Sequence, residues 1–265
     1  MRQIHHVARR RLPVVAAAFA TLGIHASVLA AQGASAAQDR RPVVAVLDYI
    51  NASMRTDADY KVLSKGIATV LAARLGETDS VRIVTREKLN EIIAEQNLGT
   101  SGRVESGQAV QVGKLLNAHH IIYGTYIVQP NGDTRMTASA YSVETSEMEY
   151  STQVRGSADK LQDLIDQLGD KLATGMKLPA ARARQVGTTR GSGAGASAGT
   201  PARATGNLAE LVILSKAIDA DDRKAKSEAI PLYKMFLAKA PPSSYLAQRR
   251  LAEAKIREAG GGSDN

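Results

Sequence analysis

Between residues 37 and 178, short apolar runs alternate with longer segments in which apolar residues recur every three or four positions. Val43–Leu47 is apolar throughout, as in a β-strand that is covered on both faces. The next segment has helical periodicity in Leu63, Ile67, Val70, Leu71 and Leu75. Gly76 follows at a position where helices commonly end. This pattern predicts a buried strand and then a helix.

A second strand and two helices are predicted next. Val81–Val84 has the length and composition of a short strand. Thr85 is placed to cap the helix that follows, with Glu87 near the positive end of that helix. The polar segment Gly99–Gly107 is predicted to be a loop, and apolar residues at helical spacing over residues 109–116 indicate a third helix.

Three strands and a closing helix complete this part of the chain. The strands are predicted over residues 120–127, 135–143 and 148–154, and Asn131-Gly132 forms the first tight turn between them. A final amphipathic helix is predicted over residues 161–176. The order β-α-β-α-α-β-β-β-α predicts an α/β fold in which helices cover a mixed sheet.

A low-complexity segment separates this part from the C-terminal part. Residues 179–206 are basic at first and then consist almost wholly of Gly, Ser, Ala and Thr. Such a segment cannot bury enough apolar surface to offset the entropy lost on ordering. We therefore predict a flexible linker between two folded parts.

The C-terminal part, residues 207–259, is predicted to be helical, and residues 260–265 are predicted to form a disordered tail. Pro231 is compatible with a helix if it falls in the first turn. The weak resemblance to one tetratricopeptide repeat rests on Ala229, Tyr233, Pro241, Ala247 and Leu251. Because a solitary repeat cannot bury its apolar face, we expect these helices to pack on further helices, on the first domain or on another chain.

The N-terminal segment has the layout of a secretion signal. Arg2 and Arg9–Arg11 form a positive region, and an apolar stretch and small residues follow in that order. The strongly apolar part is shorter than the roughly 20 residues that a membrane-spanning helix needs. We predict a signal peptide over residues 1–36, cleaved after Ala36 or alternatively after Ala30, and export to the periplasm.

Charge and cysteine content narrow the range of partners. The net charge is +8, but four positive charges belong to the predicted signal and five lie between residues 177 and 203. The rest of the chain is nearly neutral and aromatic residues are only 4%, so nucleic-acid binding is disfavoured. Since the chain has no Cys, disulfides and the acylated Cys of a lipoprotein are excluded, and membrane contact is expected to be peripheral only.

Several segments of the first domain follow one another in an order that is found in one protein family. They are Val44–Tyr49, Val81–Leu89, Ile92–Gln96, Gly113–Thr125, the hairpin Ala138–Val154 and Arg155-Gly156. Together they resemble the CsgG family, the curli secretion and assembly component of the outer membrane. The resemblance covers nearly the whole first domain and implies a role in outer-membrane assembly or secretion.

The chain departs from this family where the family crosses the membrane. A membrane-crossing hairpin needs two strands of about 9–11 alternating residues each. The candidate insertion points, Gly99–Gly107, residues 131–133 and residues 144–147, are too short and too polar for that. We expect a periplasmic protein that keeps the scaffold of the family without its pore-forming hairpins. The resemblance would allow homo-oligomeric rings, although no sequence feature indicates them.

The sequence contains no recognisable catalytic or phosphate-binding motif. His119 and His120 are adjacent in a predicted strand, so they point to opposite faces and cannot readily share a metal ion. Asp48 ends the first strand, where we expect a capping or turn role, and the acidic residues of Glu144–Glu149 are expected to form a solvated turn. We predict no catalytic residue, no metal and no cofactor.

Recognition is predicted instead on two surfaces, the loop after the second helix and the helical tail. The candidate residues are Glu95, Gln96, Arg103, Glu105, Tyr233 and Phe236. The predicted function is to scaffold or regulate an outer-membrane assembly or secretion process through contacts with envelope proteins. The alternative is a regulatory binding module that acts on a cell-wall enzyme, as penicillin-binding-protein activators do.

Overall fold

The structure is a computed structural model, and it describes residues 41–53, 58–77, 80–95, 106–178 and 206–260. The predicted signal peptide, most of the predicted linker, most of the loop before residue 107 and the C-terminal tail lie outside these residues. Among the described residues, no helix is both long enough and apolar enough to cross a membrane.

The described part of the chain contains a mixed sheet of six strands. Its strands are β1 (Val43–Val46), β2 (Ile50–Asn51), β3 (Arg82–Ile83), β4 (His120–Val128), β5 (Asp133–Ser142) and β6 (Met148–Ser157). The order is β3-β1-β4-β5-β6, with β2 beside β4; β1 is parallel to β3 and β4, and β4, β5 and β6 are antiparallel. The predicted mixed sheet is therefore confirmed. The prediction did not include β2, because a strand of two residues is too short to show a pattern.

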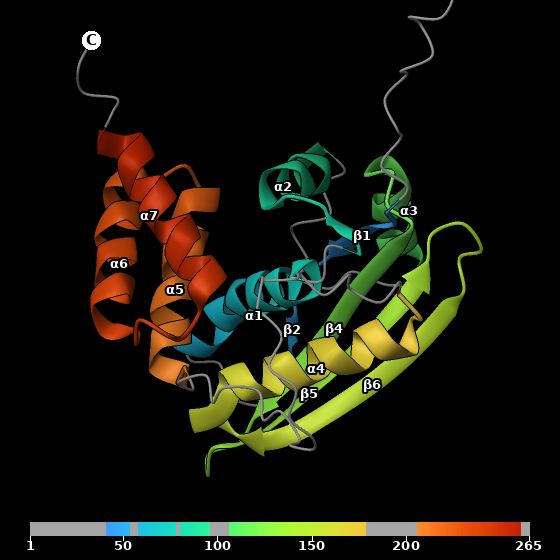
Figure 1. Cartoon of the computed structure of the whole chain (residues 1–265), viewed down its shortest axis with the longest axis horizontal. Helices are drawn as coiled ribbons and strands as arrows, with labels where there is room; N and C mark the ends of the chain where they lie inside the picture. Colours follow the sequence, from blue (N-terminus) through green and yellow to red (C-terminus); the bar gives the residue numbers. More distant parts are fainter. Residues whose placement is uncertain (1–40, 54–57, 78–79, 96–105, 179–205, 261–265) are drawn as a thin grey trace, which may run out of the picture. The chain divides into compact units, whose positions relative to one another are not determined.

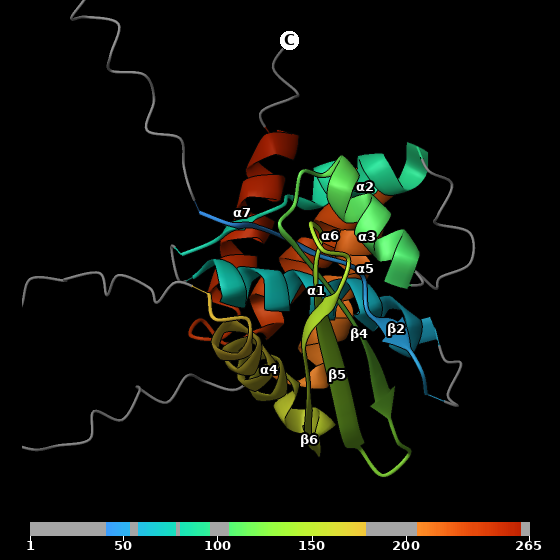
Figure 2. The same ribbon diagram turned by 90° about the vertical axis from the view of Figure 1, so that its right-hand side faces the viewer.

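Helices cover both faces of the sheet (Figures 1 and 2). They are α1 (Ala58–Gly76), α2 (Arg86–Glu95), α3 (Ser106–Leu115) and α4 (Leu161–Gly175). Alternate residues of β4 divide between the two cores: Ile122 packs with α1 and α4, whereas Ile121 packs with α2 and α3. Both faces of β1 are buried for this reason, as its unbroken apolar run predicts.

Gly124 of β4 packs closely against β5 and against the core that α1 and α4 cover. A Cβ atom there would overlap the carbonyl oxygen of Thr137 and come within 2.7 Å of the Tyr49 ring. The fully buried Tyr49 ring takes the space that a side chain would occupy. Glycine is needed at this position because of close packing and not because of its backbone angles.

Three C-terminal helices, α5 (Leu208–Asp222), α6 (Lys226–Lys239) and α7 (Leu246–Gly260), pack on the α/β part mainly through α1. Leu211, Leu214 and Ile218 of α5 belong to the same hydrophobic core as α1 and α4. Gly66 of α1 lies at the crossing, since a Cβ there would overlap the Ser215 hydroxyl. The helical tail thus buries its apolar face on the first domain, one of the three expected arrangements.

The expected position of Pro231 in its helix was wrong. Because α6 begins at Lys226, Pro231 lies in the interior of the helix and not in its first turn. The helix begins early because the turn after α5 is closed by a hydrogen bond from Ala225 N–H to the Ala220 carbonyl. Pro231 and Ser227 are both exposed, so water can replace the backbone bond that proline cannot make.

Candidate functional site

An open cleft of about 1240 Å³ lies between α1, α2 and the C-terminal helices. Its floor is α1, which contributes Ala68, Ala72 and Gly76 at four-residue spacing on one face. Because these side chains are small, they do not fill the space between α2 and the C-terminal helices. Ile218, Tyr233 and Leu251 line the opposite side, so much of the lining is apolar.

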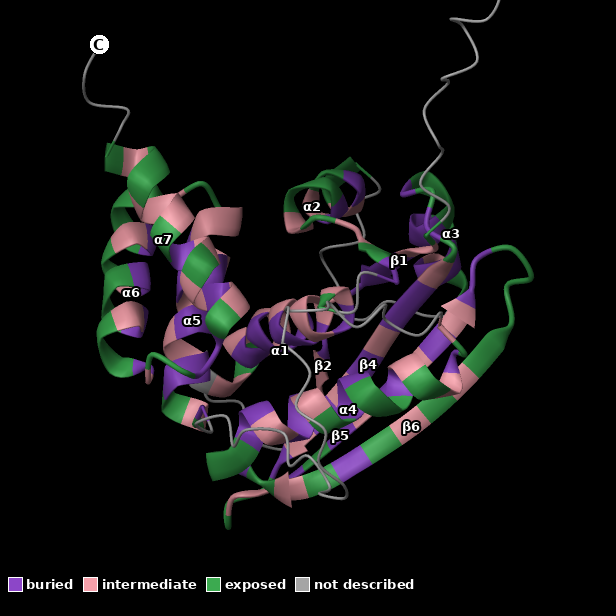
Figure 3. Ribbon diagram, viewed as in Figure 1, coloured by how far each residue is buried: buried purple, intermediate pink, exposed green. Residues whose placement is uncertain are grey.

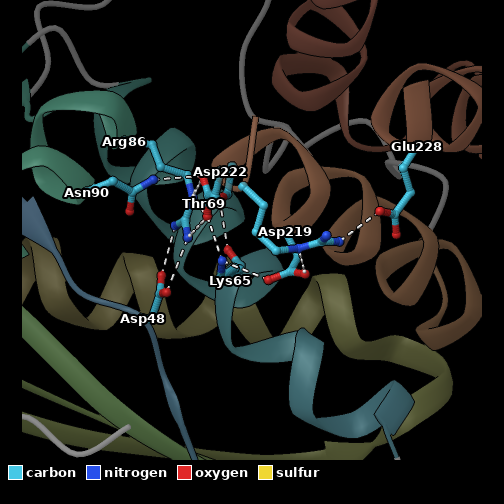
Figure 4. Close-up of polar contacts among 9 residues, drawn as sticks. Asp48, Lys65, Thr69, Arg86, Asn90, Asp219, Asp222 and Glu228 are labelled. Carbon is cyan, nitrogen blue, oxygen red and sulfur yellow. Dashed lines mark hydrogen bonds and ion pairs between the residues drawn. The ribbon is translucent and has the colours of Figure 1, made fainter. Parts of the chain in front are cut away.

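A cluster of charged side chains joins the α/β part to α5 at the edge of this cleft (Figure 4). Asp222, at the end of α5, accepts hydrogen bonds from Arg86 Nη2 at 2.8 Å and Arg86 Nε at 3.1 Å. It also accepts from Lys65 Nζ and Asn90 Nδ2, each at 2.8 Å. One carboxylate therefore receives donors from both α1 and α2.

Arg86 is held from its other side by Asp48, which follows β1. The two guanidinium nitrogens of Arg86 lie 2.8 and 3.2 Å from the two oxygens of Asp48, a bidentate arrangement. The side chains of Arg86 and Asp222 are only 18% and 13% exposed, which strengthens their attraction relative to a surface pair. Asp48 thus forms an ion pair with Arg86, whereas we expected a capping or turn role.

The pKa values of these groups are shifted towards their charged forms. Burial works to raise the pKa of Asp222, but the hydrogen bonds and positive charges of Arg86 and Lys65 outweigh it and hold the pKa below its ordinary value. Burial likewise opposes the charge of Arg86, yet Asp48 and Asp222 raise its pKa further. The cluster is a stable set of charges at neutral pH.

A second ion pair crosses from α7 to the start of α2. Lys255 Nζ lies 3.0 Å from an oxygen of Asp221 and 3.4 Å from an oxygen of Glu87. All three residues line the cleft. The α2 wall is thereby connected to the C-terminal helices through α5 at one point and through α7 at another.

These charges occupy unfavourable places within their own helices. Asp219, Asp221 and Asp222 stand in the last turn of α5, where the helix dipole disfavours acids, and no basic residue accompanies them there. Arg86 stands at the first position of α2, where the dipole disfavours a positive charge. Each misplaced charge is neutralised by another element, so the local mismatch is a sequence signal of long-range pairing that our sequence analysis missed.

The predicted interaction residues end up in different surroundings. Glu95 is exposed at the end of α2, and Gln96, Arg103 and Glu105 lie outside the described residues. Tyr233 is buried and lines the cleft. Phe236 is fully buried against the Tyr245 ring, with centroids 5.9 Å apart, so it is a packing residue and is not available to a partner.

The candidate metal and acid–base residues are held in pairs. His119 Nδ1 accepts the Val43 backbone N–H at 3.0 Å, and His120 Nδ1 lies 2.7 Å from Glu149. Within the described residues, no group of three or more His, Asp or Glu side chains is arranged to hold a metal ion. Glu144 is exposed, in keeping with a solvated turn.

The geometry of the site suits binding of an apolar surface. Asp222, Asp48 and Lys65 form ion pairs that join separate elements, and the floor of the cleft is made of small residues, of which Ala68 is buried and Ala72 and Gly76 are partly exposed. Concave apolar surfaces with a few fixed polar groups are the usual form of binding sites. The fold and the site together define an α/β domain with an attached helical unit and an apolar cleft between them.

One family model matches the N-terminal half of the chain. Residues 26–155, just under half of the chain, match the model described as curli production assembly/transport component CsgG. The match confirms the predicted resemblance; it does not extend to the C-terminal helices, whose likeness to a tetratricopeptide repeat is not confirmed. A search of curated protein sequences gives no match.

The matches to solved structures include three bacterial proteins. The LpoB C-terminal domain from Escherichia coli has a TM-score of 0.37 and 15% identity, covering 44% of this chain and 82% of that one. The PelC dodecamer from Paraburkholderia phytofirmans has a TM-score of 0.34 and 16% identity, covering 53% and 90%. The lipoprotein GNA1162 from Neisseria meningitidis has a TM-score of 0.35 and 12% identity, covering 49% and 96%. These weak similarities imply nothing about the partners of this chain.

Proposed function

We propose that this protein is a non-enzymatic periplasmic component of outer-membrane assembly or secretion, and that it works by binding a segment of another envelope protein in the cleft. The match of residues 26–155 to the CsgG family model supports the envelope role. The observation that carries the binding role is the apolar cleft of about 1240 Å³ between α1, α2 and the C-terminal helices. The chain acts without pore-forming hairpins of its own, and its contact with membranes is peripheral.

The size of the cleft favours a polypeptide segment as its occupant. Pockets for small molecules are commonly about 300–1,000 Å³, and this cleft is larger and open along one side. The small residues of its floor suit a row of bulky side chains, as an amphipathic helix presents them. We therefore assign the cleft to an apolar helical segment.

The charges at the rim indicate the chemistry of one end of that segment. Lys224 and Lys226 line the cleft where α5 turns into α6, and both are exposed. Neither forms an ion pair with another described residue, whereas Lys88 is paired with Glu91 at 2.9 Å. The two unpaired lysines are complementary to acidic residues at one end of the bound segment.

A direct test uses a fluorescein-labelled amphipathic peptide with leucines along one face and glutamates at one end. Its anisotropy should rise on titration with the protein, and a peptide with lysines in place of the glutamates should bind about tenfold more weakly. Ala72→Trp, which fills the floor, should abolish the rise. The control Ala238→Trp lies on the exposed side of α6 away from the cleft and should bind like the wild type. Equal binding by both peptides, or an Ala72→Trp variant that binds normally, would refute the proposal.

The identity of the partner decides between the two envelope processes. A photo-cross-linking amino acid placed at residue 72 in living cells captures whatever lies in the cleft, and mass spectrometry identifies it. Capture of an outer-membrane assembly or secretion component supports the proposal. Capture of a cell-wall synthase would assign the cleft to the alternative, a regulatory module of a cell-wall enzyme, and would contradict the assembly role.

A further inference from the structure

Strand β6 forms one rim of the sheet and pairs only with β5 among the described residues (Figure 1). It is ten residues long, from Met148 to Ser157, and most of its residues are exposed or half-buried (Figure 3). An edge of this length presents backbone donors and acceptors to any chain that can align with it. The question is which chain fits.

The register with β5 shows which peptide groups face outwards. Ala158 N–H donates to the Gly132 carbonyl, so the pairs two and four residues further along, Gly156 with Thr134 and Val154 with Met136, also exchange hydrogen bonds across the ladder. The peptide groups of alternate residues therefore face β5. Those of the remaining residues, Arg155, Gln153 and Ser151, point to the free edge. An independent contact agrees, because the Gln153 carbonyl accepts a hydrogen bond from Lys171 Nζ at 3.0 Å and not from β5.

The sequence of β6 is complementary to itself in one antiparallel register. If Thr152 of one copy lies opposite Thr152 of another, Ser151 faces Gln153 and Tyr150 faces Val154. Glu149, which is the extra residue of a bulge in the ladder with β5, then lies near Arg155 on the exposed side of the sheet, once on each side of the two-fold axis. Opposite charges directly across a ladder are stabilising, and like charges are destabilising.

The hydrogen bonding fits the same register. A Thr152–Thr152 pair at the axis is a non-hydrogen-bonded pair, and the flanking Ser151–Gln153 pairs are the hydrogen-bonded ones, with about four backbone bonds in all. A shift by one residue would bring inward-facing peptide groups together and lose these bonds. A shift by two residues in one direction would place Arg155 opposite Ser151, and in the other direction opposite Glu147, which precedes β6.

We propose that β6 is a self-association edge, at which two copies of this protein pair antiparallel about Thr152 and join their sheets into one. The existing contacts of the edge set its strength. Lys171 donates a hydrogen bond to the Gln153 carbonyl, which the second copy also needs as an acceptor. Lys171 therefore competes with the second copy and weakens the dimer. Arg155 already lies 2.6 Å from Asp133 and Glu149 lies 2.7 Å from His120, so the Glu149–Arg155 pairs between the two copies compete with contacts inside each copy.

Because the chain has no Cys, single-cysteine variants test the register without background. Thr152→Cys should form a disulfide-linked dimer under copper phenanthroline, since Cα atoms of a non-hydrogen-bonded pair are about 4.5 Å apart, within the disulfide range. Ser151→Cys alone should not cross-link, because its counterpart lies two positions away, beyond about 7 Å. A mixture of Ser151→Cys and Gln153→Cys should cross-link. Failure of Thr152→Cys to cross-link, or equal cross-linking of Ser151→Cys alone, would overturn the register.

Light scattering on the full chain tests the energetics. The wild type should show a concentration-dependent mass up to twice that of one chain, and Arg155→Glu or Glu149→Arg should weaken dimerisation by about tenfold or more. The double variant Glu149→Arg with Arg155→Glu should restore it, and Lys171→Met should strengthen it. A protein that stays monomeric at all concentrations, or a double variant no better than either single one while circular dichroism shows both folded, would refute the proposal.

Discussion

The Asp222 carboxylate is one of the contacts that hold the C-terminal helices to the α/β part. Removing its charge should lower the free energy of unfolding by a measurable amount. Asp222→Asn keeps the volume of the side chain but removes the charge that receives Arg86, Lys65 and Asn90. Cutting one partner out of a buried ion pair costs about 3–5 kcal/mol. Here Arg86 keeps Asp48 and Lys65 keeps Asp219, at 2.8 and 2.9 Å, so we expect a loss of about 2–3 kcal/mol.

Urea unfolding at pH 7, followed by circular dichroism, measures this free energy directly, and a loss confined to the midpoint with an unchanged slope indicates that the folded state alone has changed. The matched control is Asp170→Asn. Asp170 also pairs with an arginine, Arg74, at 2.6 Å, but its side chain is 61% exposed. Its loss should cost less than about 1 kcal/mol. If Asp222→Asn were no more destabilised than Asp170→Asn, the Asp222 carboxylate would not hold the helices as described.

Three further predictions concern pH, close packing and capping. The pKa of Asp222 is lowered in the folded protein, so its contribution to the free energy of unfolding is complete above the unfolded pKa of about 3.9. That contribution is lost as the pH falls through the folded pKa. Urea titrations should therefore show the wild type losing its extra stability over Asp222→Asn in strong acid. Gly124→Ala should lower the unfolding free energy by about 2–4 kcal/mol, whereas Gly107→Ala in α3, with open space around it, should raise it by up to about 1 kcal/mol; the reverse ranking would contradict the packing argument. Asn207→Ala removes the side chain that accepts the Glu210 N–H at 3.1 Å in a capping box and should cost about 1 kcal/mol in a thermal melt, so an unchanged melting temperature would show that the cap is dispensable.

The elements of the α/β part could be predicted from the sequence because each has a local pattern. The unbroken apolar run of β1 and the periodicity of α1 each reflect burial within a few residues of chain. The strand β2 has only two residues and therefore too short a pattern to detect. Its pairing depends on β4, which lies more than 70 residues away along the chain.

The cleft could not be predicted in the same way because it arises between elements. Asp222 and Arg86 are 136 residues apart, and periodicity carries no information about such a pair. Two local signals do point to it. The last turn of α5 is acidic against its own dipole, and α1 is apolar or small on more than one face, as a helix covered on two sides must be. The same reasoning explains why Phe236 was wrongly expected at a surface: an aromatic residue in an amphipathic helix is more often buried.

The shared core of α1 and α5 has a practical consequence for genetic work on this protein. A truncation that removes the C-terminal helices would uncover α1 around Gly66, which packs against Leu211 and Ser215, and the shortened protein would aggregate or be degraded for reasons unrelated to recognition. A null phenotype from such a deletion would therefore say little about what the helices bind. Point substitutions that leave the interface with α1 intact keep the cellular level of the protein unchanged, so they test what the C-terminal helices bind.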